Sequence, residues 1–179
     1  MKTVGYIATS LDGYIARDNH ALDGLESPEW EDPDGSDYGF QDFLSSIDAI
    51  LIGKNTFLKV AEIGVWVYRD IPFCVVSKTL KNEEIPENLK EKVTVISGSP
   101  QELMDMLNDK KYSRVYVDGG KLLQSFIESN HLNELIITRI PILLGGGISL
   151  FGALPTDRKV KHVDTKCFKS GLTRSQYYF

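Results

Sequence analysis

Three short segments of the sequence bring together glycines, hydroxyl groups and lysines: LIGKNT at 51–56, VVSKT at 75–79 and VYVDGG at 115–120. Each segment closes an apolar run that is typical of a buried strand. Backbone N–H groups at a helix start favour an anion, and glycine lets the backbone approach it closely. If the three segments met at one edge of a sheet, they would suit a ligand with several phosphates. Gly119 and Gly120 on their own are more typical of a tight turn.

The common nucleotide-binding fingerprints do not explain these segments. The sequence contains neither GxxxxGK[ST] nor a GxGxxG that follows a strand. Three glycines at 145–147 follow an apolar run, but no acidic ribose partner lies downstream of them in a βαβ pattern. We interpret these glycines as a turn or as a place of close packing.

The apolar pattern predicts the elements that must position the three segments. Strands are expected at 2–10, 48–53, 72–77, 93–97 and 114–118, and helices at 38–47, 54–62, 99–111 and 121–130. The segments 133–147 and 160–179 read as strands alone, the second as a hairpin around Ser170 and Gly171. This order predicts right-handed βαβ units, a mostly parallel sheet with helices on both faces, and antiparallel strands at one edge. The chain is expected to form a single domain over 1–179.

Composition argues against several classes of protein. The net charge of −5 lacks the basic excess of a nucleic-acid binder, and no apolar stretch approaches the length of a membrane span. Cys74 and Cys167 are too far apart in sequence for a metal-binding or CxxC pair. The N-terminal residues do not resemble a signal peptide. We therefore expect a cytoplasmic protein without a metal site, which acts on a small molecule.

Four segments carry a family resemblance: YIATSLDGYIA, DAILIGKNTF, VYVDGGKLL and ITRIPILLGGGISLFG. In this order and spacing, between Thr3 and about Gly152, the chain resembles the dihydrofolate reductase-like reductases. It is most similar to the reductase domain of the bifunctional riboflavin-biosynthesis deaminase–reductase and its stand-alone relatives. The resemblance implies a three-layer α/β/α fold with a mixed, mainly parallel eight-stranded sheet and a C-terminal antiparallel hairpin. The cofactor that it implies is NADPH.

The resemblance also implies which residues hold the cofactor. Glycines 119 and 120, often joined by a cis peptide in this superfamily, would approach the diphosphate, and the helix that starts there would face it. Lysine 78 would lie by the 2′-phosphate, which favours NADPH over NADH. Ala8 would touch the nicotinamide amide, although it suits a tight core equally well. The implied set is Ala8, Gly53, Lys54, Thr56, Ser77, Lys78, Gly119, Gly120, Lys121 and Leu122.

Candidates for proton transfer and substrate binding lie in or beside the long polar segment 18–38. Asp37, before an expected helix, could supply the proton, or it could be an ordinary acid at a helix N-terminus. Asp12 is a second candidate, or simply a turn residue. Trp30, Tyr38 and Phe40 could stack on a flat substrate, and ordinary packing is the alternative for them, more so for Phe40.

The sequence therefore predicts an NADPH-dependent reductase of a small heterocycle, pterin-like or pyrimidine-like, or of a related imine or carbonyl compound. The first alternative is the riboflavin-pathway reductase that acts on 5-amino-6-(5-phosphoribosylamino)uracil. The second is a non-catalytic nucleotide-binding module. Segment 18–38 contains eight acidic residues and no lysine or arginine, which predicts poor binding of a phosphorylated substrate if the segment covers the site. The alternative is a solvated surface loop that points away from the substrate. A homodimer is a possible assembly.

Overall fold

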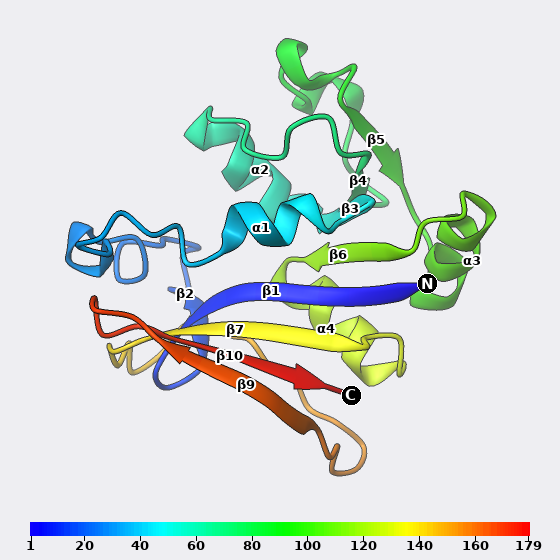
Figure 1. Ribbon diagram of the computed structural model, residues 1–179. Helices are drawn as coiled ribbons and strands as arrows, with labels where there is room; N and C mark the ends of the chain where they lie inside the picture. The colour runs from blue at the N-terminus through cyan, green and yellow to red at the C-terminus, as the bar shows by residue number, and fades with distance from the viewer.

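The structure is a computed structural model that describes the backbone of residues 1–179 and every side chain except that of Asn82. An eight-stranded sheet with the order β5-β4-β3-β6-β1-β7-β10-β9 forms its centre (Figure 1). The strands are β1 (Lys2–Ser10), β3 (Ala49–Gly53), β4 (Phe73–Val76), β5 (Val93–Ile96), β6 (Arg114–Asp118), β7 (Glu134–Ile140), β9 (Lys161–Cys167) and β10 (Thr173–Tyr178). In the described chain, no helix is long and apolar enough to cross a membrane.

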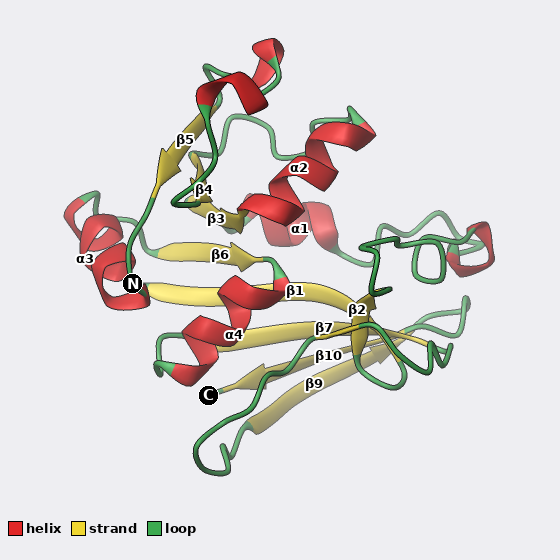
Figure 2. Cartoon of the chain, turned by 180° about the vertical axis from the view of Figure 1, so that it is seen from behind, coloured by secondary structure: helices red, strands yellow, loops and turns green.

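The sheet is parallel from β5 to β7, and the C-terminal hairpin adds β10 and β9 in antiparallel pairing. The predicted mixed, mainly parallel sheet is therefore confirmed, together with its hairpin. Helices cover both faces, and Figure 2 shows α4 on the face opposite to α1. The helices are α1 (Phe40–Ser45), α2 (Lys54–Ile63), α3 (Pro100–Asp109) and α4 (Gly120–Glu128).

Two apolar cores, one on each face, hold the helices to the sheet. Phe43 and Phe57 from α1 and α2 pack on one face, while Leu103 and Phe126 from α3 and α4 pack on the other. All four side chains are buried, and burying a large apolar side chain contributes about 1.5–3 kcal/mol. The predicted three-layer arrangement follows from this division of the core.

Local signals set the helix ends. Ser99 and Glu102 form a reciprocal capping box at the start of α3, with Pro100 at the first helical position. Gly64 ends α2 in the left-handed conformation, φ +76°. Helix α1 begins at Phe40, later than expected, because Gly39 turns the chain with φ +83°.

A small second sheet was not predicted. Strand β2 (Tyr14–Ala16) pairs with β8 (Ile148–Ser149), although their segments are far apart in sequence. Two strands this short carry almost no alternation pattern, so only tertiary pairing reveals them. The second sheet brings the glycine-rich segment 145–147 beside the end of β1. A further 3₁₀ turn, Pro28–Trp30, lies within the segment that was expected to be a loop.

Candidate active site

The carboxyl ends of β3 and β6 meet at one corner of the sheet. Gly119 adopts φ +100°, and a Cβ atom there would lie 2.7 Å from Thr56 Oγ1 and 3.4 Å from the Gly53 nitrogen. A Cβ on Gly53 would lie 4.0 Å from the Leu122 Cβ. The structure therefore brings together four of the residues predicted to hold the cofactor, Gly53, Thr56, Gly119 and Leu122. Every peptide bond is trans, so the cis bond that the resemblance suggested is not found; the positive φ of Gly119 makes the turn.

Two helices begin at this corner with glycine as the N-cap residue. Gly53 precedes α2 and Gly119 precedes α4, and neither helix start has a side-chain cap. The first backbone N–H groups of a helix need an outside partner, and an anion satisfies them well. A Cβ on Gly120 would lie 2.5 Å from Ile15 Cδ1, so β2 packs tightly against the start of α4. Lys121, the next residue, is exposed. The corner therefore presents the backbone N–H groups of two helix starts that have no side-chain cap.

Some of the polar side chains that were predicted to bind phosphate beside this corner already have partners within the protein. Lys54 Nζ lies 2.8 Å from a carboxylate oxygen of Glu84, which belongs to the β4–β5 connection. This contact lowers the pKa of Glu84 below its usual range. Ser77 Oγ accepts hydrogen bonds from the backbone of Thr79 and Leu80, and its own proton remains available to donate. Lys78 is exposed after the end of β4.

A cavity of about 430 Å³ opens at the carboxyl ends of β1 and β7. Its floor comes from the strands and from Leu172, which directly precedes β10, and its roof comes from the segment 25–38. Ala8 lies in the floor and is exposed there, which favours its predicted contact with a ligand over a place in a tight core. The lining residues are Tyr6, Ala8, Leu25, Glu26, Ser27, Pro28, Trp30, Glu31, Asp37, Tyr38, Thr138, Ile140 and Leu172.

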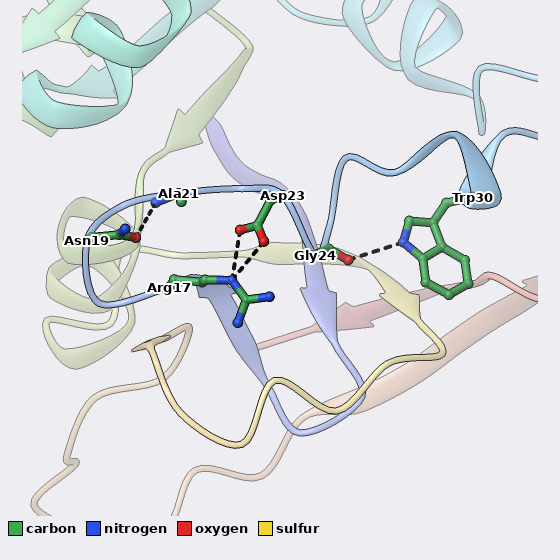
Figure 3. Close-up of polar contacts among 6 residues, drawn as sticks. All are labelled: Arg17, Asn19, Ala21, Asp23, Gly24 and Trp30. Atoms are coloured by element: carbon green, nitrogen blue, oxygen red, sulfur yellow. Dashed lines mark hydrogen bonds and ion pairs between the residues drawn. The ribbon is translucent and has the colours of Figure 1, made fainter.

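The roof gives the cavity an acidic rim. Glu26, Glu31 and Asp37 line it, and no lysine or arginine is among the described lining residues. The Arg17 Nε atom lies 2.8 Å from a carboxylate oxygen of Asp23 on the loop after β2, and Figure 3 shows this ion pair. Arg69 donates to Gln41 and Ser45. Arg17 and Arg69 are the arginines nearest in sequence to the roof segment, and neither of them lines the cavity.

The three aromatic candidates have different places. Trp30 lines the cavity, and its indole N–H donates to the Gly24 carbonyl at 3.1 Å (Figure 3). Tyr38 also lines it, in the left-handed conformation with φ +59°, while its ring stands edge-on to Phe168 at 4.8 Å. Phe40 does not reach the cavity, because it packs on Tyr6 with ring centroids 5.5 Å apart. The position of Phe40 therefore agrees with ordinary packing, the alternative to stacking on a substrate.

The two candidate acids are both held as anions. Asp37 accepts the backbone N–H groups of Gly39 and Gln41, which lowers its pKa and makes it the acid of the α1 N-terminus. Asp12 accepts the Ser10 hydroxyl and two backbone N–H groups of the segment 144–145, and its pKa is lowered as well. Asp12 thus ties the turn after β1 to the glycine-rich loop. A role for either as proton donor stays a prediction, and their hydrogen bonds favour the structural alternative.

Strand register adds residues that the sequence did not single out. Thr138 pairs with Ala8 on one side and with Arg174 on the other, so the three residues form one row across β1, β7 and β10. Thr138 Oγ1 is buried in the cavity floor and has no hydrogen-bond partner among the described residues. Arg174 Nη1 donates to the Tyr38 carbonyl. In the sequence, Thr138 lies 130 positions from Ala8 and 36 positions from Arg174, so no local pattern could have joined these residues.

One buried acid lies directly before Gly119, at the end of β6. Asp118 ends β6 and accepts the Gly119 N–H at 2.8 Å. Burial raises its pKa from 3.8 to about 6, against the opposing hydrogen bond from Gly119. The motif VYVDGG contains this aspartate, but only the burial of the strand end shows that its charge is unfavourable.

Comparisons with known proteins agree with this architecture. The chain is 34% identical over 170 residues to the protein YwjB of Bacillus subtilis (strain 168), covering 93% of this chain and 92% of that protein. The crystal structure of a putative riboflavin biosynthesis protein from Shewanella sp. PV-4 has 35% identity and a TM-score of 0.90, with 99% of this chain and 98% of that one covered.

A more distant structure shows the fold alone. Dihydrofolate reductase from Enterococcus faecalis, solved with NADP(H), superimposes with a TM-score of 0.65 at 14% identity, over 99% of this chain and 95% of that one. The sheet order and the helical layers thus correspond to the dihydrofolate reductase-like fold that the sequence predicted. The profile of the RibD C-terminal domain matches residues 4–173, nearly the whole chain. The protein therefore belongs to the RibD C-terminal domain family, a family of reductases with a dihydrofolate reductase-like fold.

Proposed function

We propose that this protein is an NADPH-dependent reductase of a small heterocyclic substrate or a related imine or carbonyl compound. The observation that carries the proposal is the corner of Gly53, Thr56 and Gly119, where two uncapped helices start beside a cavity at the same edge of the sheet. A side chain on Gly119 would fill the space that a diphosphate needs. When bound, NADPH would supply a hydride, and the chain itself would supply binding and orientation.

Titration of the protein with NADPH, followed by nicotinamide fluorescence, tests the cofactor assignment. We expect saturable binding by the wild type and its loss in Gly119→Val, because the new side chain would meet Thr56 and would also strain a backbone of φ +100°. Gly146→Ala is the control, since Gly146 has open space around its Cβ position and no positive φ. Unchanged NADPH affinity in a folded Gly119→Val protein would remove the corner from the cofactor site.

The preference for NADPH over NADH is assigned to Lys78, exposed at the end of β4. An exposed lysine near a phosphate contributes up to about 1 kcal/mol, which corresponds to roughly five-fold in affinity. Lys78→Ala should therefore reduce the ratio of NADPH to NADH affinity by several-fold, most strongly at low salt. A ratio that does not change would place the 2′-phosphate elsewhere.

The acidic rim supports a neutral or cationic substrate. Glu26, Glu31 and Asp37 face the cavity, whereas a ribosyl phosphate needs a cationic clamp, best made by arginine. Arg174 already donates to the Tyr38 carbonyl and is not among the lining residues. The riboflavin-pathway reductase is the second candidate, favoured by the family match.

A non-catalytic module that only binds a nucleotide is a third reading. The cavity of about 430 Å³ at the carboxyl ends of β1 and β7 supports an enzyme instead, and a metabolite panel monitored for NADPH oxidation separates the two. A homodimer and a cytoplasmic location also belong to the proposal. Sedimentation velocity measures the first and fractionation of the producing cells measures the second.

A further inference from the structure

Reduction of a C=N or C=O bond consumes a proton as well as a hydride, and the two candidate acids are poor sources of one. Backbone hydrogen bonds hold the pKa of Asp37 below 3.8, and hydrogen bonds from Ser10 and from the segment 144–145 do the same for Asp12. At pH 7 such a carboxyl carries a proton in fewer than about one molecule in a thousand. Asp118 keeps its proton more readily, but it is buried behind the cofactor corner and does not line the cavity.

Tyr6 is the protonated hydroxyl group that lines the cavity from β1. It lies two residues before Ala8 on the same face of the strand, so its side chain and the expected nicotinamide contact share one side of the sheet. Its ring is stacked on Phe43 with centroids 4.5 Å apart and tilted against Phe40. Tyr116 donates to the Tyr6 carbonyl at 3.0 Å. Packing and hydrogen bonding therefore fix the position of the phenol.

The phenol shares its hydrogen-bond acceptor with a guanidinium. Tyr6 donates to the Tyr38 carbonyl at 3.0 Å, and Arg174 Nη1 donates to the same carbonyl. If the Tyr6 hydrogen turns to a substrate atom, this carbonyl keeps a donor and is not left unsatisfied. Arg174 then lies beside the oxygen on which negative charge would develop, in a partly buried site where such an interaction is strong.

The groups around the phenol come from four elements. Burial raises the pKa of Tyr6 most and Asp37 before α1 also raises it, while Arg174 on β10 lowers it. Tyr116 on β6 lies nearby and is itself buried. The Thr138 hydroxyl, unpartnered in the cavity floor, can hold a polar atom of a ligand next to Tyr6.

We propose that Tyr6 is the catalytic residue that donates the proton to the substrate, with Arg174 as the positioning residue that stabilises the resulting phenolate. The inference rests on the proposed reductase function. As a hydride from NADPH forms a C–H bond at the substrate carbon, the π bond of C=N or C=O breaks. Its electron pair takes the Tyr6 proton on nitrogen or oxygen. The phenolate then recovers a proton from water.

Steady-state NADPH oxidation with 6-methyl-7,8-dihydropterin and with the dephosphorylated aminouracil tests the role in turnover. Tyr6→Phe should lower kcat by about 100-fold or more, the usual contribution of a general acid, while the Kd for NADPH stays within about two-fold. Tyr112→Phe is the matched control, because Tyr112 is a tyrosine outside this cavity. Because the pKa of Tyr6 is raised, wild-type kcat should stay level through neutral pH and fall only in strongly alkaline solution. With an Asp37 donor, whose pKa is lowered, kcat would already fall as the pH rises through the acidic range.

A second measurement needs no turnover. With ¹³C-labelled tyrosine, the Cζ resonance that disappears in Tyr6→Phe reports the pKa of Tyr6 directly. Arg174→Met should raise that pKa, and Arg174→Lys should restore part of the shift, which a purely structural role of Arg174 would not produce. Adding 6-methylpterin with NADP⁺, a pair that cannot react by hydride transfer to the pterin, should move the Tyr6 resonance and leave that of Tyr112 in place.

Different results would overturn the proposed reductase function and the proposed role of Tyr6. A wild-type protein that neither binds NADPH nor oxidises it with either substrate overturns the proposed function. A wild type that binds and reacts, with Tyr6→Phe retaining kcat within about three-fold, overturns the role of Tyr6 alone. A Tyr6 resonance that does not respond to 6-methylpterin and NADP⁺ in a protein that binds both also overturns it.

Discussion

Asp118 shows how a single residue can work against stability at the site that it supports. Its carboxyl group fixes the Gly119 N–H at the turn into α4, yet burial raises its pKa to about 6. The folded protein therefore binds the proton more tightly than the unfolded chain, where the pKa is 3.8. The stabilising contribution of the Asp118 carboxyl group to the free energy of unfolding is fully present below about pH 4. It is lost as the pH rises through 6.

We expect Asp118→Asn to stabilise the protein at pH 8, because the amide oxygen keeps the bond to Gly119 without a buried charge. A shift of about two pKa units corresponds to roughly 3 kcal/mol at most, so a gain of about 1–3 kcal/mol is expected. Urea unfolding between pH 3.5 and pH 8 measures it, with Asp164→Asn on the exposed strand β9 as control. A gain of the same size at pH 3.5 would contradict the linkage to Asp118 ionisation.

Side-chain contacts connect the cavity roof, residues 25–38, to the turn of the C-terminal hairpin. The Tyr38 hydroxyl contacts the Trp30 carbonyl and lies 3.0 Å from Ser170 Oγ. Lys169 pairs with Asp34 at 2.8 Å. The roof segment has few buried apolar side chains of its own, so these contacts decide how often it opens.

Tyr38→Phe should therefore loosen the roof without unfolding the sheet. Removing one hydroxyl with two partners costs about 1 kcal/mol, which predicts roughly five-fold faster amide hydrogen exchange in residues 28–37. Exchange in β7 should not change, and Lys169→Ala should have a smaller effect because its ion pair is exposed. Equal exchange rates in the roof of Tyr38→Phe and wild type would show that the hydroxyl contacts do not hold it.

An acid on the β4–β5 connection pairs with a lysine beside the proposed cofactor site. Glu84 holds Lys54 at 2.8 Å, and its carboxylate would repel a nearby phosphate. Glu84→Gln should tighten NADPH binding by about two- to five-fold, the range expected for a partly exposed charge. The gain should shrink at high salt. Glu87→Gln, which removes an exposed pair with Lys90 on the same connection, is the control. Weaker NADPH binding by Glu84→Gln would mean that Glu84 positions Lys54 for the phosphate.

For the whole molecule, charge distribution selects among substrates. The net charge is −5, three of the acidic side chains line the cavity, and no lysine or arginine is among its described lining residues. A substrate phosphate would thus enter a field that repels it. We expect kcat/KM for the phosphorylated ribosylaminopyrimidine to be at least about ten-fold below that of its dephosphorylated form at low ionic strength.

Steady-state assays of the two compounds at 20 mM and 300 mM salt measure this preference. The difference should narrow at high salt, because screening weakens the acidic field. A phosphorylated compound that alone gives kcat/KM of about 10⁴ M⁻¹s⁻¹ or above would identify the riboflavin-pathway reaction instead. The cofactor assignment would not be affected by that result.

The sequence by itself determined the features that depend on neighbouring residues. Ser99, Pro100 and Glu102 are adjacent in the chain, so the start of α3 could be predicted. The alternation of apolar strands and helices predicted the parallel sheet, and the four motifs indicated the fold family. The motifs also predicted that Gly53 and Gly119 lie close together, and their role in holding a cofactor stays a prediction. These signals are local because hydrogen-bonding caps and side-chain periods span only a few residues.

Only the tertiary structure decided which distant residues share the cavity. The register of β1, β7 and β10 places Ala8, Thr138 and Arg174 in one row, and it brings Tyr6 and Arg174 to the same carbonyl of Tyr38. The pairing of β2 with β8 and the contact of Lys54 with Glu84 also join separate segments. A shift of one residue in strand register would turn every side chain of a strand to the opposite face, and no local pattern in Arg174 or Tyr6 encodes that register.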